Sequence, residues 1–163
     1  PTPEPVSVAC AVITVSDTRS PTQDSSGKTI QSQLMAAGHQ VARYEIVPDE
    51  PLIIQTTLQQ LGEQRGIQAV IFNGGTGIAP RDTTYDAIQA LLDKELPGFG
   101  EIFRALSYQE IGSRAIASRA TAGIYRNLIV FSLPGSTSAV ILGMEKLILP
   151  ELVHLTGLFL RCK

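Results

Sequence analysis

Residues 69 to 77 read Ala69-Val70-Ile71-Phe72-Asn73-Gly74-Gly75-Thr76-Gly77. The first four side chains are apolar without alternation, which is typical of a strand covered on both faces of a parallel sheet. The glycines that follow let the backbone approach an anion and direct N–H groups toward it, as phosphate-binding loops do. A tight strand-to-helix turn that merely needs positive φ is the alternative interpretation. The stretch therefore predicts an α/β sheet with a candidate anion-binding turn at one edge.

Strand-like and helix-like segments alternate outward from this stretch. Continuous apolar runs predict two more buried strands at Val8–Val15 and Leu128–Leu133, and the more alternating run Gln40–Val47 predicts a strand nearer an edge. Apolar residues at helical spacing predict the connecting helices, through Ile30, Leu34 and Ala37; Ile54, Leu58 and Leu61; Thr84–Asp93; Ile102, Leu106 and Ile111; and a C-terminal pair broken at Pro150. No linker or internal repeat interrupts this order, so we expect one domain over residues 1–163 with right-handed crossovers.

The composition is that of a near-neutral globular protein. Its 13 basic and 15 acidic side chains give a net charge of −2, which argues against a cationic module that grips nucleic acid. Hydrophobic residues make up 44% of the chain and charged residues 17%, and the mean hydropathy is +0.14. We therefore expect some apolar surface to close against other copies of the chain.

The sequence also predicts a reduced, cytoplasmic setting. Cys10 and Cys162 lie in apolar surroundings near opposite ends, so both are interpreted as reduced structural cysteines. Pro1–Pro5 has neither the basic start nor the apolar run of a signal peptide. The longest apolar stretch, Ala139–Leu160, contains charged residues such as Glu145, which favours two buried helices over a membrane span.

Ligands of open parallel sheets bind beyond the carboxyl ends of the strands, so the turns that leave the apolar runs are the candidate sites. Pro134-Gly135-Ser136 precedes a predicted helix and forms a second candidate anion site, in which Ser136 also suits the role of helix cap. Ser16-Asp17 is the polar turn after the first strand. Ser118-Arg119 brings a guanidinium that can clamp a phosphate, stack on an aromatic ring or form a surface ion pair.

Two carboxylates suggest a role for a divalent cation. Asp82 follows the glycine turn by five residues, and a carboxylate beside bound phosphate repels it unless a cation such as Mg²⁺ intervenes. The alternatives for Asp82 are a cap for the helix Thr84–Asp93 or an ion pair with Arg81. Asp49 suits the role of cap for the second helix, and Asp86 that of a solvated acid in a first helical turn.

Several familiar motifs are absent. Gly27-Lys28-Thr29 imitates the end of a P-loop, but Thr22 occupies the position of the required first glycine. Pro80 occupies the third small position of a dinucleotide fingerprint that would begin at Gly75. Histidine-based catalysis has little support, because His39 is interpreted as a surface residue and His154 as a core residue.

Taken together, these motifs resemble those of the molybdenum-cofactor biosynthesis MoaB/Mog family. The matching segments are Thr14-Val15-Ser16-Asp17, Asp24-Ser25-Ser26-Gly27, Pro48-Asp49-Glu50, Gly74-Gly75-Thr76-Gly77, Arg81-Asp82, Pro97-Gly98-Phe99-Gly100-Glu101, Ser118-Arg119-Ala120 and Pro134-Gly135-Ser136. The resemblance spans nearly the whole chain in one order. It implies a three-layer α/β/α sandwich with a mostly parallel central sheet, which assembles as trimers or hexamers and binds molybdopterin.

The resemblance also implies an activity. Active members of the family are molybdopterin adenylyltransferases, which use Mg²⁺ and ATP to join AMP to the molybdopterin phosphate and release pyrophosphate, ahead of metal insertion by another biosynthesis protein. Carried over by motif, Asp49 and Asp82 are the critical acids and the Mg²⁺ ligands. The turns Gly74, Gly75, Thr76, Gly77 and Pro134, Gly135, Ser136 would line the substrate pocket, with Ser16, Asp17, Ser118 and Arg119 as further pocket residues.

The resemblance leaves one alternative and one departure. The stretch Gly98–Gly112 looks most like the MoaB branch, so a catalytically silent molybdopterin carrier or scaffold is the alternative; both acids are present, which favours catalysis. The apolar tail Leu158–Lys163 departs from typical members and is expected at a subunit contact.

Overall fold

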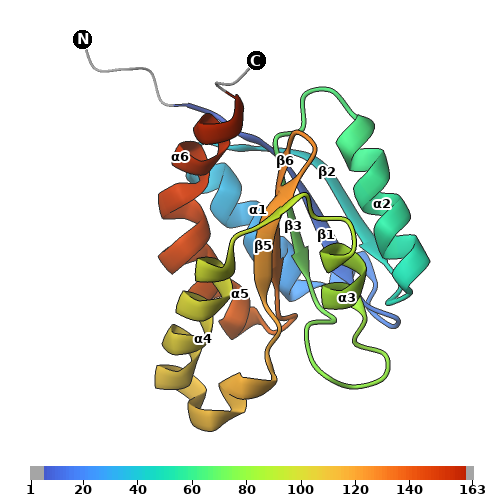
Figure 1. Cartoon of the computed structure of the whole chain (residues 1–163), viewed down its shortest axis with the longest axis vertical. Coiled ribbons are helices and arrows are strands. Elements are labelled where there is room, and N and C mark those ends of the chain that lie inside the picture. The colour runs from blue at the N-terminus through green and yellow to red at the C-terminus, as the bar shows by residue number, and fades with distance from the viewer. Residues whose placement is uncertain (1–5, 161–163) are drawn as a thin grey trace.

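The computed structural model describes residues 6–160, with only the backbone for residues 159 and 160, and it forms a three-layer α/β/α sandwich (Figure 1). The central sheet has six strands in the order β2-β1-β3-β6-β5-β4. These are β1 (Ala9–Val15), β2 (Gln40–Val47), β3 (Ala69–Asn73), β4 (Lys94–Glu95), β5 (Thr121–Tyr125) and β6 (Leu128–Leu133). The four strands β2, β1, β3 and β6 run parallel, whereas β5 is antiparallel to both β6 and β4.

Helices cover both faces of the sheet (Figure 1). One face carries α1 (Ser25–Ala36), α4 (Pro97–Ile111), α5 (Thr137–Gly143) and α6 (Leu149–Leu160), and the other carries α2 (Pro51–Glu63) and α3 (Thr84–Gln89). Two 3₁₀ segments, Pro21–Gln23 and Gly112–Ala117, and a π-helical segment, Met144–Ile148, complete the regular structure of the described residues.

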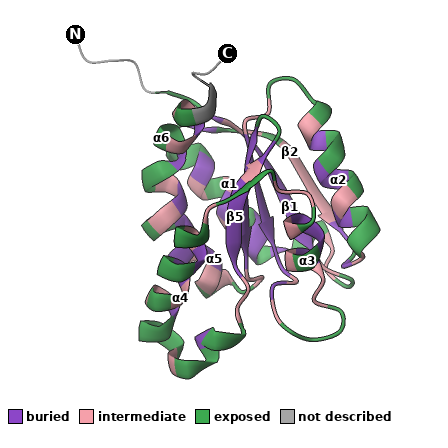
Figure 2. Ribbon diagram, viewed as in Figure 1, coloured by how far each residue is buried: buried purple, intermediate pink, exposed green. Residues whose placement is uncertain are grey.

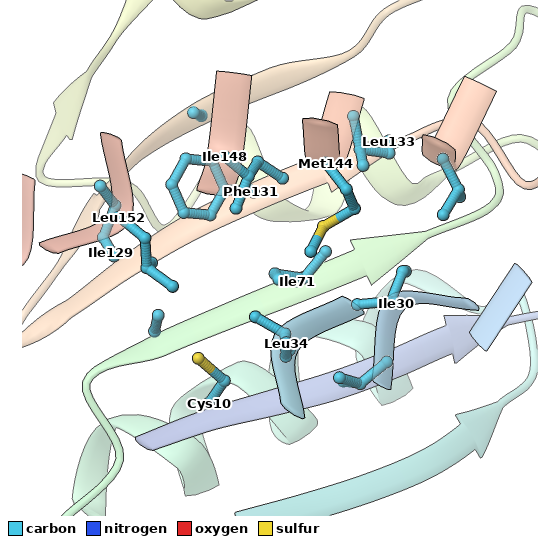
Figure 3. Packing of buried hydrophobic residues seen from close by; sticks show 14 of the residues in the cluster. Cys10, Ile30, Leu34, Ile71, Ile129, Phe131, Leu133, Met144, Ile148 and Leu152 are labelled. Atoms are coloured by element: carbon cyan, nitrogen blue, oxygen red, sulfur yellow. The ribbon is translucent and has the colours of Figure 1, made fainter. Parts of the chain in front are cut away.

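The strands are apolar on consecutive positions because each face of the sheet has its own core. On β1, Cys10 and Val12 pack toward α1, while Ala11 and Ile13 pack toward α2. Figure 3 shows the first of these cores, where Ile30 and Leu34 of α1 lie among Ile71, Met144 and their neighbours. The sheet is buried between exposed outer helix faces (Figure 2), so the predicted two-sided α/β sheet is confirmed.

The predicted strands are all present, and β2 lies at the edge of the sheet, as the more alternating pattern of its sequence predicted. The sequence did not predict β4, which has only two residues, or β5, in which Thr121 and Gly123 interrupt any continuous apolar run. A two-residue connection joins β5 to β6, and its first residue, Arg126, adopts a positive φ of 53°. The connection lacks the Asn-Gly or Asp-Gly pair that marks such hairpins in a sequence. Because β5 runs antiparallel to both of its neighbours, the sheet is mixed, although mostly parallel.

Three other predictions need correction. The helix expected over Thr84–Asp93 ends at Gln89. Pro150 does not break the C-terminal helices: it is the second residue of α6, and the preceding π-helical turn, in which the Leu149 N–H donates to the Met144 carbonyl, absorbs the irregularity. The predicted surface and core positions of the two histidines are reversed. His39 is only 8% exposed and accepts a hydrogen bond from the Val8 N–H, whereas His154 is exposed.

Cys10 is buried and free, and burial raises the pKa of its thiol to about 12. Cys162 and Pro1–Pro5 lie outside the described residues, as does most of the Leu158–Lys163 tail. Among residues 6–160, none of the helices combines the length and the apolar character that crossing a bilayer requires.

Candidate functional site

The turn after β3, the turn after β6 and the segment around Ser118 meet beyond the carboxyl ends of β3 and β6. They line one cavity of about 310 Å³. Its walls are formed by Gly75, Thr76, Gly77, Asp82, Ser107, Ile111, Ser118, Pro134, Gly135, Ser136 and Ala139. Because β3 and β6 run parallel, the turns that follow them lie at the same end of the sheet, the end at which these two strands finish (Figure 1).

The glycine turn after β3 requires glycine at two positions. Gly74 has φ +106° and Gly75 has φ +68°, both in the region that side chains disfavour. A Cβ on Gly74 would lie 2.3 Å from the carbonyl oxygen of Val15, so the turn passes directly against the end of β1. The N–H of Gly74 donates to the Leu133 carbonyl and ties the turn to β6. The interpretation that the glycines provide positive φ is therefore correct. It is compatible with the other interpretation, in which the turn binds an anion.

The next three residues of this turn line the cavity. Within residues 6–160, the N–H groups of Gly75, Thr76 and Gly77 donate to no other protein group. Successive unpaired N–H groups in a glycine-rich turn form a concave site for an anion. The geometry thus supplies what the binding interpretation of Gly74–Gly77 requires.

The turn Pro134–Ser136 forms the opposite wall. The Ser136 hydroxyl caps α5 by accepting from the Ala139 N–H at 3.3 Å, so the cap interpretation is confirmed. A Cβ on Gly135 would lie 3.2 Å from Cα of Gly74, which shows how closely the two glycine turns approach. Arg19 holds this turn by donating to the Gly135 carbonyl at 3.0 Å.

Asp82 lines the cavity and neither of its structural alternatives holds. The N-cap residue of α3 is Thr83, and Arg81 pairs with other acids. One oxygen of Asp82, Oδ2, accepts from the Ala79 N–H at 3.0 Å. Its Oδ1 receives no hydrogen bond within the described residues, so this oxygen remains for a ligand or a cation.

Asp49 lies behind the glycine turn and does not line the cavity. Its side chain is 7% exposed, and Oδ1 accepts from the Thr83 N–H at 3.1 Å and from the Thr83 hydroxyl at 2.6 Å. Asp49 is not the cap of α2, whose N-cap position is Glu50. Its Oδ2 receives no hydrogen bond from residues 6–160 and points toward Gly75, where an added Cβ would lie 2.6 Å away.

Ser16 and Asp17 lie beside the cavity rather than in its wall. The Ser16 hydroxyl accepts from the N–H groups of Thr18 and Arg19 and shapes its own loop. Asp17 accepts from the Asp49 N–H at 2.9 Å and forms a two-pronged pair with Arg81, which also contacts Glu50 at 2.7 Å. These bonds, the Asp49 N–H first, hold the pKa of Asp17 below its usual range.

Ser118 lines the cavity, whereas the guanidinium of Arg119 is engaged with protein groups. It donates to the carbonyls of Gly77 at 3.0 Å and Asp82 at 2.9 Å, and it pairs with Asp86 at 3.0 Å. It also lies over the ring of Tyr85, 5.0 Å from the centroid. Both the aromatic contact and the ion pair are therefore present, and Asp86 is a partner of Arg119 although its side chain is 64% exposed.

A buried polar cluster behind the cavity escaped the sequence analysis. Asp24 is fully buried and accepts from Thr14 at 2.6 Å, Tyr44 at 2.5 Å and the Gly27 N–H at 3.0 Å. Burial alone would raise the pKa of Asp24, but these hydrogen bonds lower it below its usual value. The available signal was a polar residue, Thr14, near the carboxyl end of an otherwise apolar strand.

Comparison with known proteins agrees with this architecture. The family described as "Probable molybdopterin binding domain" matches residues 11–154. The chain belongs to this family. The molybdopterin-binding-domain match includes every candidate residue from Ser16 to Ser136.

Relatives of known name cover almost the whole chain. "Molybdenum cofactor biosynthesis protein B" of Bacillus subtilis is 57% identical over 148 residues, which are 90% of this chain and 87% of that protein. A crystal structure of a molybdenum cofactor biosynthesis protein B has a TM-score of 0.94 at 49% identity and covers 96% of this chain and 98% of its own. The tungsten cofactor synthesizing protein MoaB from Pyrococcus furiosus has a TM-score of 0.84 at 41% identity, covering 94% of this chain and 97% of its own. The expected MoaB/Mog resemblance and fold are thereby confirmed.

Proposed function

We propose that the chain acts in molybdenum cofactor biosynthesis as a molybdopterin adenylyltransferase. The observation that supports this most directly is the convergence of unpaired glycine amides and the Asp82 carboxylate in one cavity. An anion-binding turn beside a carboxylate suits a reaction in which phosphates and a divalent cation meet. The family match supports molybdopterin as the substrate, and the names of the relatives support a role in molybdenum cofactor biosynthesis.

The turns bind and orient the substrate in this proposal. The N–H groups of Gly75, Thr76 and Gly77 hold the terminal phosphate of molybdopterin from one side. The turn Pro134–Ser136 closes the other side, and Ser118 contributes a hydroxyl. A phosphate oxygen of molybdopterin attacks the α-phosphorus of ATP, the bond from that phosphorus to the bridging oxygen breaks, and pyrophosphate leaves. Alignment carries most of the catalysis, because the attacking group is already anionic.

The two acids fit the cation that such a reaction uses. Mg²⁺ in phosphate-binding sites is held by one or two carboxylates together with substrate oxygens. Within the described residues, one oxygen of each acid, Asp82 Oδ1 and Asp49 Oδ2, receives no hydrogen bond, so these two oxygens would hold the ion. When bound, the ion offsets the negative charge that gathers on the phosphates. Asp49 Oδ1 meanwhile fixes Thr83, which is the residue next to Asp82.

The test combines purified protein, molybdopterin, ATP and Mg²⁺, with adenylylated molybdopterin and pyrophosphate as the measured products. We expect Asp82→Asn to lower kcat by about 100-fold while the molybdopterin Kd changes less than about threefold, because the acid acts on the cation rather than on the pterin. Gln89→Ala, at the C-terminal end of α3 and outside the cavity wall, is the control. Tight molybdopterin binding by the wild type without any ATP-dependent product would refute catalysis and establish the carrier alternative.

We also propose that the chain works in the cytoplasm as a trimer or hexamer, alongside the other proteins that make the cofactor. An apolar groove of about 310 Å³ between α4 and α6 is the surface that another copy would cover. It is lined by Leu96, Pro97, Gly98, Phe99, Ile102, Phe131, Leu147, Glu151 and Leu155. Light scattering on a sizing column should show a multiple of the 17.5 kDa chain, and Ile102→Glu should shift it toward the monomer.

A further inference from the structure

Asp82 stands on an irregular loop that is held largely from outside. Residues 78–81 are exposed and have no regular secondary structure. Inside the loop, the Asp82 N–H donates to the Ala79 carbonyl and the Asp82 carboxylate accepts from the Ala79 N–H. These two short-range bonds make a local turn, but they do not fix where the turn sits relative to the cavity.

Arg81 and Thr83 hold one side of this loop through Asp17, Glu50 and Asp49, and Arg119 connects the other side to the rest of the fold. Its backbone N–H donates to the Thr76 carbonyl at 2.8 Å, at the start of the loop. Its guanidinium reaches the Gly77 carbonyl at 3.0 Å and the Asp82 carbonyl at 2.9 Å, so one side chain spans both ends of the loop. Asp86, at 3.0 Å, and the Tyr85 ring hold the same guanidinium from the α3 side.

A second arginine holds the segment that carries Arg119. Arg104 of α4 donates to the carbonyls of Ala120 at 3.0 Å and Ser118 at 3.4 Å. Gly100 makes this approach possible, because a Cβ there would lie 2.8 Å from the Arg104 guanidinium nitrogens and 2.6 Å from the Ala120 carbonyl. The close approach of Arg104 and Ala120 thus explains why the motif Gly98-Phe99-Gly100 has glycine at position 100.

We propose that Arg119 is a positioning residue that sets the place of the Asp82 carboxylate, and that Arg104 supports it from α4. This inference rests on the proposed function, in which Asp82 holds the cation. The role differs from the phosphate clamp, which is one of the three roles that the sequence left open for Arg119. Three of its five N–H donors are committed to the protein, and the Asp86 carboxylate offsets its charge.

The planar guanidinium is what makes arginine suitable for this role. Its fork meets two carbonyls and one carboxylate at the same time, whereas the ammonium of lysine is a compact point charge. Partners that act through a cation-binding residue typically change metal affinity by about 10- to 100-fold when removed. We expect removal of Arg119 to change Mg²⁺ affinity by the same range, without a comparable change in molybdopterin affinity.

The experiment compares wild type, Arg119→Ala, Arg119→Lys and Asp86→Asn. In the adenylylation assay, Arg119→Ala should raise the Mg²⁺ concentration for half-maximal rate by at least about tenfold, while the molybdopterin Kd measured without Mg²⁺ changes less than about threefold. Added guanidinium ion should restore part of the adenylylation activity that Arg119→Ala loses. The adenylylation activity of Arg119→Lys should be lower than that of the wild type. Asp86→Asn keeps the bonds of Arg119 to the Gly77 and Asp82 carbonyls, so its Mg²⁺ concentration for half-maximal rate should stay within about twofold of the wild-type value.

Amide hydrogen exchange of residues 74–86 supplies a readout that does not depend on catalysis. The loop amides should exchange at least about tenfold faster in Arg119→Ala, and close to the wild-type rate in Asp86→Asn. Loss of molybdopterin affinity in Arg119→Ala with unchanged Mg²⁺ dependence and unchanged loop exchange would overturn the inference and restore the clamp. If the wild type forms no product but Arg119→Ala still speeds exchange of the loop amides, the proposed function is refuted and the positioning role of Arg119 is not.

Discussion

Replacing Gly74 with alanine separates two physical demands on the turn after β3. Gly74 adopts φ +106°, and an added Cβ would lie 2.3 Å from the Val15 carbonyl oxygen, which is backbone of β1. Gly66 provides the matched control, because it has a similar φ of +93° but no atom within 4 Å of the Cβ position. The difference between the two variants therefore measures the close approach of the turn to β1.

The expected magnitudes follow from these two terms. The unfavourable φ alone costs about 1 to 2 kcal/mol of folding free energy, which is the expected loss in Gly66→Ala. Overlap with packed backbone adds about 1 to 3 kcal/mol, so Gly74→Ala should lose about 2 to 5 kcal/mol in total. For a chain of this size 1 kcal/mol lowers Tm by about 2 to 4 °C, which gives a drop of about 4 to 20 °C for Gly74→Ala.

Urea unfolding monitored by circular dichroism, at one fixed protein concentration, measures both losses from the transition midpoints. The concentration is fixed because association with other copies would change the apparent stability. Equal losses in Gly66→Ala and Gly74→Ala would refute the reasoning, since only the close contact with Val15 distinguishes them. A crystal structure of Gly74→Ala should show the turn displaced from β1.

Three further outcomes are expected. Gly77→Ala should leave Tm within about 2 °C, because the Cβ would meet only the movable Asp82 carboxylate at 2.6 Å, yet it should raise the half-saturating Mg²⁺ concentration about tenfold; an unchanged Mg²⁺ dependence would contradict this. Burial lowers the pKa of His39 below its usual 6.5, so the folded state binds this proton less readily than the unfolded chain does. Its contribution to stability is then complete above about pH 6.5 and declines as the pH falls, and His39→Gln should flatten that decline in urea titrations run at several pH values. Asp24→Asn should lose about 3 kcal/mol in the same measurement, because the buried hydroxyl donors lose a charged acceptor; a loss below about 1 kcal/mol would show that the cluster tolerates a neutral side chain.

Much of the architecture is legible in the sequence because it depends on local periodicity. The apolar runs that became β1, β3 and β6 are continuous because helices cover both faces, and the alternation of β2 matches its place at the edge. The short strands β4 and β5 carry no comparable pattern. Their pairing is set by the hairpin into β6 and by a close contact at Gly123, where a Cβ would lie 2.4 Å from the Lys94 carbonyl.

The candidate site divides along the same line. The glycine turn and the turn Pro134–Ser136 are recognisable from composition, because positive φ, unpaired amides and helix caps demand particular residue types at particular local positions. The roles of Asp49 and Arg119 are not recognisable in this way. Asp49 bonds to Thr83, 34 positions away, and Arg119 bonds to the Asp82 carbonyl, 37 positions away.

The sequence by itself determined the alternation of strands and helices, the need for glycine in the turn after β3 and the presence of acids near it. Only the tertiary structure decided that Asp82 faces the cavity, that Asp49 lies behind it, and that Arg119 serves the loop. The physical reason is that backbone conformation responds to neighbours in the chain, whereas the partner of a long polar side chain depends on which distant segments packing brings within hydrogen-bond distance.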